Sequence, residues 1–211
     1  SNDLYANYRT NKTYSRAPFS SKGLGNLGIM KPDIMCPGVG VFSAQSLANG
    51  SANHKGLAVK FGTSMATPSC AGASALLYQY FLEGKYRNKP MNISAQLARS
   101  FMINSADPLS TIYPNAINGF GVLNLGKYIG NGDEPDNKHL FVGDHIKITE
   151  EHLMTTITLT KTEDIDFHAT ISYLDDTLSS DSSAALSADL DLVIVSPSGK
   201  VYRGNQREDG T

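Results

Sequence analysis

The chain has 211 residues, of which 40% are hydrophobic and 18% are charged, and its formal net charge is −2. These values supply enough apolar side chains for a buried core, but no basic field that would hold nucleic acid or an acidic membrane surface. No apolar stretch approaches the roughly 20 residues that a membrane-spanning helix needs. We therefore expect neither a nucleic-acid partner nor a transmembrane segment.

Residues 1–130 predict a mixed α/β unit. A loop with two prolines leads into a short apolar run, Val39 to Phe42, which predicts a buried strand, and LAVKFG (57–62) predicts a second strand. Apolar residues at intervals of three and four predict a helix from Ser64 to about Leu82. Its alanines and glycines lie on several faces, which indicates a central helix that is packed nearly all round.

Two shorter helices are expected next. Ser94 is of the type preferred at an N-cap, and it precedes a predicted helix from about Ala95 to Ser105. Its buried stripe contains Leu97, Phe101 and Met102 or Ile103. A short third helix is expected to start near Leu123.

The chain has two cysteines, Cys36 and Cys70, which are too few for a disulfide framework. Both lie in apolar segments, and neither has the CxxC neighbour that would indicate zinc. We favour two buried thiols that pack as small hydrophobic side chains, with a disulfide between them as the alternative. Three N-x-S/T sequons, at Asn11, Asn49 and Asn92, are compatible with secretion, but a chain this rich in Asn, Ser and Thr contains sequons by chance.

The sequence pattern changes at residues 131–138, which contain no large apolar residue and predict a linker. Residues 139–211 then predict an antiparallel β-domain, with alternation at 154–160 and 165–173 and a hairpin about Pro197–Gly199. This domain holds fewer strands than the roughly eight of a jelly roll. The chain also starts without Met, so we expect that both ends are cut.

Ser64 lies where a short polar cluster meets the longest predicted helix. On the residues alone, Thr63 and Ser64 before an apolar helix are most simply an ordinary N-cap. A helix start also offers free N–H groups and a favourable dipole to a developing oxyanion, and Gly62 would let a substrate backbone approach closely. Pro68 is expected in about the first turn, where its missing N–H costs little. The pattern by itself favours the cap and leaves a nucleophilic serine open.

Four motifs resemble those of the subtilisin-like serine proteases (subtilases, peptidase family S8), in the family's order. GTSMATP (62–68) resembles the motif of the catalytic serine, and KPDIMCPG (31–38) resembles the KPDI-x-APG segment. APFSSKG (17–23) resembles the FSS-x-G stretch, and GFGVLN (119–124) resembles the start of the last helix of the catalytic domain. The resemblance covers residues 17 to about 129. It implies a parallel-sheet α/β catalytic domain, of which the chain holds the C-terminal part.

The resemblance implies that Ser64 is the nucleophile of a serine endopeptidase and forms an acyl-enzyme with its substrate. The N–H of Ser64 would be one oxyanion donor, supported by Thr63 and Gly62. The family's Asp and His motifs and its oxyanion asparagine would precede residue 1, so the chain alone is expected to be inactive. The expected partners are protein or peptide substrates and the N-terminal part of the catalytic domain. Substrate-binding residues are not assigned, because the pocket strands also lie upstream.

Two alternatives to this assignment are weaker. GTSMA (62–66) is a near miss to the G-x-S-x-G nucleophile elbow, but that fold needs parallel βα units after the serine, and the predicted order here is helices and then antiparallel strands. His54 precedes Ser64 in a polar loop and is a poor candidate for the base. The remaining histidines lie in or beyond the linker without metal-ligand spacing, at positions 139, 145, 152 and 168.

Residues 171–205 resemble the β-jelly-roll domain appended to some secreted subtilases, with Tyr173 in place of its Trp and Ala188 in place of its Asn. The expected core side chains of this segment are Leu190, Leu192 and Ile194. The resemblance implies a secreted, cell-surface or vesicular-lumen location. The fold class is thus an α/β portion followed by an antiparallel β-sandwich or jelly-roll domain.

The peptidase chemistry requires no cofactor, although the appended domain is a candidate to bind a structural calcium ion. Several carboxylates would suit such a site, but turn and edge carboxylates are the simpler interpretation of Asp175, Asp176, Asp189 and Asp191. Asp33 lies where some relatives have a weak cation site, and a turn or capping carboxylate is again favoured. Two alternative functions stay open: a catalytically inactive subtilase homologue and a calcium-dependent binding module.

Overall fold

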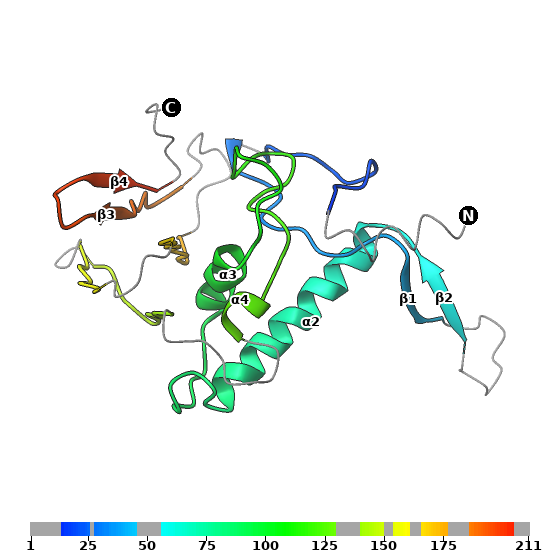
Figure 1. The fold of residues 1–211 in the computed structure, drawn as a ribbon, viewed down its shortest axis with the longest axis horizontal. Helices are drawn as coiled ribbons and strands as arrows, with labels where there is room; N and C mark the ends of the chain where they lie inside the picture. Colours follow the sequence, from blue (N-terminus) through cyan, green and yellow to red (C-terminus); the bar gives the residue numbers. More distant parts are fainter. Residues whose placement is uncertain are drawn as a thin grey trace.

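The computed structural model describes residues 14–25, 28–45, 56–129, 140–149, 154–160, 166–176 and 186–204. In chain order, these residues form strands β1 (Val41–Ala44) and β2 (Leu57–Lys60), helices α2 (Thr63–Leu82), α3 (Ala95–Asn104) and α4 (Gly126–Ile129), and strands β3 (Val193–Val195) and β4 (Val201–Arg203). Figure 1 shows the β1–β2 hairpin beside the N-terminal end of α2, and the β3–β4 hairpin at the opposite end of the view.

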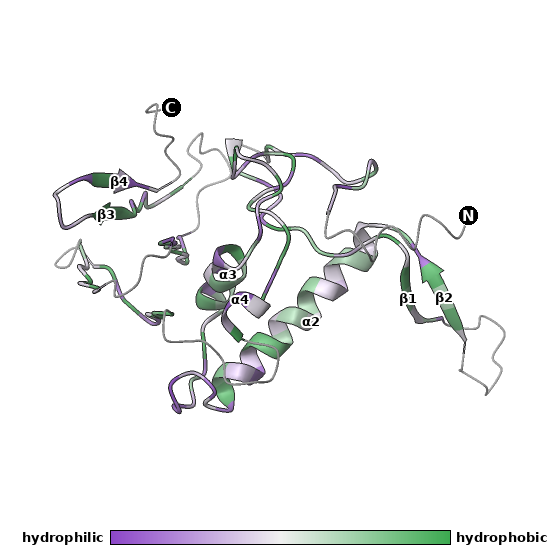
Figure 2. Cartoon of the chain, viewed as in Figure 1, coloured by the Kyte–Doolittle hydropathy of each residue, from purple (hydrophilic) through white to green (hydrophobic). Residues whose placement is uncertain are grey.

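The buried core lies where the C-terminal half of α2 meets α3. Phe81 of α2 is fully buried, and its ring centroid lies 5.3 Å from that of Tyr80, 5.4 Å from Tyr86 and 5.8 Å from Phe101 of α3. Figure 2 shows hydrophobic residues on both helices. The other buried members of this cluster are Leu77, Ile93, Leu97, Ala98 and Leu140.

The predicted helices are confirmed. The long helix is α2, and α3 begins at Ala95 with Ser94 as its N-cap, because the Ser94 Oγ accepts the Leu97 N–H at 3.0 Å. Leu97, Phe101 and Ile103 are the buried stripe of α3. The short third helix is α4, which starts three residues after the expected position.

Two predictions of burial in this region are wrong for the described residues. The predicted buried strand is β1, whose Phe42 is 66% exposed, because β1 pairs only with β2 in a two-stranded antiparallel sheet. Helix α2 is not packed all round: Leu77 is buried, but Leu76 and Leu82 are each 62% exposed. Within the described ranges, the parallel pairing expected of an α/β domain is limited to the bridge between Met35 and Val122.

The second half of the chain matches the β-prediction in part. The hairpin about Pro197–Gly199 is confirmed as β3–β4, closed by the Ser196 N–H donating to the Lys200 carbonyl at 2.9 Å. Leu190, Leu192 and Ile194 are half-buried and alternate with exposed neighbours. Residues 154–160 and 166–173, however, form no strand within the described part of the chain, so those strand predictions are wrong there. A jelly roll stays a prediction.

Segments from the second half contact α3 and the loop that follows α2. The Leu140 carbonyl accepts hydrogen bonds from the Tyr86 hydroxyl at 3.3 Å and from the Arg87 guanidinium at 3.1 Å. The Asn104 Nδ2 of α3 donates to the Thr170 Oγ1 at 2.9 Å. The linker predicted at 131–138 lies outside the described residues, so the domain boundary at that point stays a prediction.

Candidate active site

Helix α2 places Ser64 at its exposed N-terminal end. Gly62 is the N-cap, with φ 148° and ψ 161°, and no side chain caps the helix. The prediction of an ordinary Thr63–Ser64 side-chain cap is therefore wrong, because the helix begins at Thr63 and Ser64 already belongs to its first turn. Among the residues that the structure describes, none hydrogen-bonds the Ser64 Oγ, and the side chain is exposed. The hydroxyl is thus accessible.

The first turn of α2 presents free N–H groups beside Ser64. The Met65 and Ala66 N–H groups both donate to the Gly62 carbonyl, at 3.0 Å and 3.3 Å. In the described part of the chain, the N–H groups of Thr63 and Ser64 have no such acceptor. They lie at the positive end of a 20-residue helix, where an anionic oxygen is stabilised. The Ser64 N–H can therefore act as an oxyanion donor.

Pro68 lies inside α2 and not in its first turn as predicted. It removes the N–H that would otherwise bond the Ser64 carbonyl four residues earlier. The neighbouring carbonyls have hydroxyl donors: the Thr67 Oγ1 donates to the Thr63 carbonyl at 3.0 Å, and the Ser69 Oγ donates to the Met65 carbonyl at 3.1 Å. These two side-chain hydrogen bonds thus provide extra donors to backbone carbonyls at the start of α2, on either side of Ser64.

The two cysteines form a disulfide, so the favoured prediction of two buried thiols is wrong. Cys36 lies in the loop before β1, and Cys70 lies on α2, with 5.8 Å between their Cα atoms. The same loop bonds the helix N-cap, because the Gly62 N–H donates to the Gly38 carbonyl at 2.8 Å. A Cβ on Gly38 would lie 2.8 Å from the Gly62 carbonyl oxygen, so the close approach requires glycine. The loop therefore fixes the end of the helix that carries Ser64.

Asp33 forms two ion pairs with basic side chains. Its carboxylate accepts the Lys31 ammonium at 2.6 Å and the Arg99 guanidinium of α3 at 2.8 Å. Within the described residues, these two ion pairs account for the Asp33 carboxylate, and no backbone N–H donates to it as a turn or cap would require. The weak cation site stays a prediction. Across the described ranges, no cluster of three or more His, Cys, Asp and Glu residues could hold a metal ion.

The histidines of the described residues lie elsewhere. His145 is exposed, and its ring nitrogen lies 3.4 Å from the Asn92 carbonyl, next to the start of α3. His168 is also exposed. His54 and two others, at positions 139 and 152, lie outside the described residues.

Asp175 is one of the carboxylates that the sequence predicts to be turn or edge groups. Its oxygens accept the N–H groups of Ser187 at 2.8 Å and of Ala188 and Asp176 at 2.9 Å. The hydrogen bond from the Ser187 N–H is the main cause that lowers the pKa of Asp175. The Tyr173 hydroxyl also donates to the Ala188 carbonyl at 2.8 Å, so the two residues that depart from the jelly-roll pattern meet. These hydrogen bonds fit the turn-carboxylate interpretation of Asp175, which stays a prediction.

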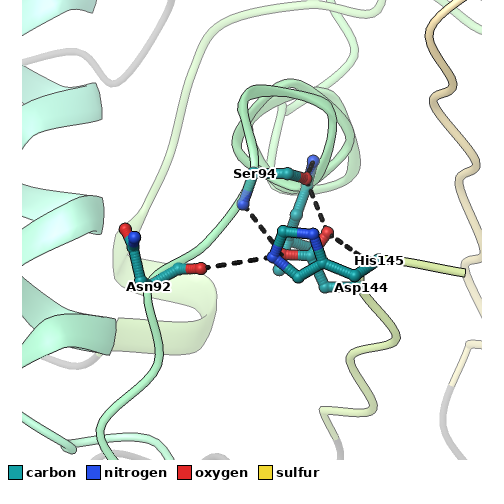
Figure 3. Close-up of polar contacts among 5 residues, drawn as sticks. Asn92, Ser94, Asp144 and His145 are labelled. Atoms are coloured by element: carbon teal, nitrogen blue, oxygen red, sulfur yellow. Dashed lines mark hydrogen bonds and ion pairs between the residues drawn. The ribbon is translucent and has the colours of Figure 1, made fainter.

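A polar cluster that the sequence did not predict joins the start of α3 to residues 144–145 (Figure 3). The Asp144 carboxylate accepts the Ser94 N–H at 2.8 Å and the Ser94 hydroxyl at 2.5 Å. Burial raises the pKa of Asp144, but the bonds from Ser94 and from the His145 N–H outweigh that effect, so the net pKa is lowered. We call these contacts of Ser94, Asp144 and His145 the α3 clamp. Its partners lie 50 residues apart, and no local pattern links them.

Comparison with known protein families gives a match over most of the helical part of the chain. The model of the subtilase family (Peptidase_S8) matches residues 6–122, which is more than half of the chain. These residues include Ser64, the first three motifs in chain order and the start of the fourth, which ends at Asn124. In the described residues, no helix combines the length and the apolar character needed to cross a membrane.

Three relatives illustrate the range of similar proteins. The chain is 35% identical over 111 residues to the serine protease/ABC transporter B family protein tagD of Dictyostelium discoideum, covering 46% of the chain and 6% of the relative. It is 48% identical over 63 residues to the subtilisin-like protease SBT3.2 of Arabidopsis thaliana, covering 29% and 8%. It is 43% identical over 70 residues to the serine protease AprX of Bacillus subtilis, covering 30% and 16%. The chain thus spans less than a fifth of the length of each of these relatives.

Proposed function

This chain belongs to the subtilase family, and we propose that it is part of a serine endopeptidase whose nucleophile is Ser64. The observation that carries the proposal is the position of Ser64: exposed, in the first turn of α2, with its own N–H free within the described residues. Thr63 supplies the second free N–H, and Gly62 keeps the approach to the serine open.

In the proposed reaction, the Ser64 Oγ attacks the scissile carbonyl carbon while a histidine takes its proton. The carbonyl oxygen becomes negative and is stabilised by the Ser64 N–H. Collapse of the intermediate expels the amine, which receives the proton, and leaves an acyl-enzyme on Ser64. Water then releases the acid product and restores the hydroxyl. The histidine and its orienting aspartate come from another part of the full-length protein, so residues 1–211 alone should not cleave peptides.

The proposed substrates are proteins or peptides, and the proposed location is secreted, cell-surface or in a vesicular lumen. The Cys36–Cys70 disulfide supports this location, because disulfides persist in oxidising compartments and are rare in the cytosol. Residues 139–211 are proposed to begin a β-sandwich or jelly-roll domain. The β3–β4 hairpin and the alternating burial that leads into it are compatible with such a domain.

A fluorophosphonate probe tests the proposal on the full-length protein. Such probes phosphonylate only a serine that a base activates, so wild type should label and Ser64→Ala should not. Ser69→Ala is the matched control, because Ser69 lies on the same helix with its hydroxyl donated to the Met65 carbonyl. Labelling that survives Ser64→Ala would refute Ser64 as nucleophile. A folded wild type that takes no label would favour the inactive homologue.

A further inference from the structure

We propose that Asn92 carries an N-linked glycan. Asn92-Ile93-Ser94 has the N-x-S pattern of an acceptor site, and the structure places it in the loop just before α3. Asn92 itself is exposed, whereas the intervening Ile93 is 4% exposed and belongs to the helical core. The alternation directs the acceptor asparagine to solvent while its neighbour anchors the loop.

The folded protein has room for the modification. The His145 ring nitrogen of the α3 clamp lies 3.4 Å from the backbone carbonyl of Asn92, and the Asn92 side chain makes no bond to the clamp. Figure 3 shows the Asn92 amide pointing away from Asp144 and His145. In the part of the chain that the structure describes, no group hydrogen-bonds that amide. A sugar on the Asn92 Nδ2 would therefore leave every contact of the clamp in place.

The serine of the acceptor site has a second role once the chain is folded. The Ser94 hydroxyl donates to Asp144 and accepts the Leu97 N–H, so it is fully engaged. Asp144 follows Ser94 by 50 residues, so Asn92 is synthesised well before the clamp can close. We place the modification in this interval, while Ser94 is still free.

The reaction is a glycosyl transfer from a diphosphate-activated oligosaccharide. A bond forms between the Asn92 Nδ2 and the anomeric carbon of the first sugar, and the bond from that carbon to the diphosphate breaks. The diphosphate leaves with the electron pair, and the amide loses one proton to a base of the transferase. Asn92 keeps one amide proton and becomes a secondary amide.

The proposed secretory location is consistent with N-glycosylation. The Cys36–Cys70 disulfide indicates an oxidising environment, and N-glycosylation of the N-x-S/T type occurs in secretory compartments. The inference rests on the proposed location and not on the proposed peptidase activity. The other two sequons, at Asn11 and Asn49, lie outside the described residues.

The test is site-specific mass spectrometry on the full-length protein isolated from cells that produce it naturally. Treatment with peptide-N-glycosidase in heavy-oxygen water converts a glycosylated Asn92 into a labelled aspartate. We expect the label at Asn92 in wild type and in Ser94→Thr, which keeps both the acceptor pattern and the hydroxyl. We expect none in Asn92→Gln or in Ser94→Asn, which retains a preferred N-cap residue but removes the acceptor pattern.

An unmodified Asn92 in the wild-type protein would overturn the inference. The state of the cysteines, read from the same digest, separates the two reasons for that outcome. An oxidised Cys36–Cys70 pair without a glycan would refute the glycan and leave the proposed location standing. Reduced cysteines would refute both.

Discussion

Cys36 and Cys70 are joined by a disulfide that ties the loop before β1 to α2, the helix that begins at the candidate nucleophile. The same loop contributes the Gly38 carbonyl that accepts the Gly62 N–H at 2.8 Å. A covalent bond and a hydrogen bond therefore act on one short segment of backbone. This segment sets the position of the Ser64 N–H, on which the proposed oxyanion stabilisation depends.

Removal of the disulfide should destabilise the full-length protein. The bond joins residues 34 positions apart, and closing a loop of that size typically contributes about 2–4 kcal/mol. Cys36→Ala combined with Cys70→Val should lower the free energy of unfolding by that amount in urea. A reductant should lower the midpoint of wild type and leave the double variant unchanged. Equal midpoints for wild type and variant would argue against a stabilising bond.

Gly62→Ala should be destabilising and should slow probe labelling of Ser64. Gly62 has φ 148°, which side-chain-bearing residues rarely adopt, and strain of this kind costs about 1–3 kcal/mol. Steric clash is not the cause, because the nearest neighbour of an added Cβ in the described residues is the Met65 Sδ at 3.7 Å. The measurements are urea unfolding and the rate of labelling by a fluorophosphonate.

Gly72→Ala is the matched control on the same helix. An added Cβ at Gly72 meets no atom of the described residues within 4 Å, and alanine is preferred to glycine inside a helix by about 0.5–1 kcal/mol. This variant should be as stable as wild type or more so, with unchanged labelling. If Gly62→Ala behaved like Gly72→Ala, the backbone strain assigned to Gly62 would be wrong.

Phe81→Ala should be among the most damaging single changes in the helical core. Phe81 is fully buried and contacts the rings of Tyr80, Tyr86 and Phe101, so its truncation leaves a cavity that costs about 3–5 kcal/mol. The next residue supplies the comparison, since Leu82 is 62% exposed and Leu82→Ala should change stability by about 0.5 kcal/mol or less. Thermal unfolding of the two variants side by side measures the difference. Similar losses would mean that Leu82 is covered in the full-length protein.

The helices could be predicted because their signals are local. Within α2, apolar side chains recur at intervals of three and four residues. The Ser94 side chain caps α3 by accepting the N–H of Leu97, three residues later. The resemblance to the subtilases rests on four motifs in order, and each motif is a short run of consecutive residues. Each of these signals therefore lies within a few neighbouring residues.

The other features depend on residues that are distant in the chain. Burial of β1 was predicted from its apolar side chains, but burial of a strand is decided by what packs on the sheet, and Phe42 is exposed. The alternation at 154–160 could specify a strand only if a partner strand lay beside it. The disulfide and the bond between Asp144 and Ser94 join residues 34 and 50 positions apart, and no local pattern reports such pairs.

Asp144→Asn should remove an acid-sensitive contribution to stability. The pKa of Asp144 is lowered from its ordinary value of 3.8, so the folded state favours the ionised carboxylate. This contribution is complete above the pKa of the unfolded state and is lost as the pH falls through the lower folded pKa. At neutral pH, Asp144→Asn weakens charge-assisted bonds to Ser94, which should cost about 1–3 kcal/mol.

The expected signature of Asp144→Asn is a gap from wild type that is constant at neutral pH and shrinks below about pH 3.8. Urea unfolding of the full-length protein between neutral pH and the acid limit measures it. Asp166→Asn is the control, because Asp166 is exposed and lies outside the α3 clamp, and that variant should stay close to wild type. A gap for Asp144→Asn that persisted unchanged into acid would show that the lost interaction does not depend on the charge of Asp144.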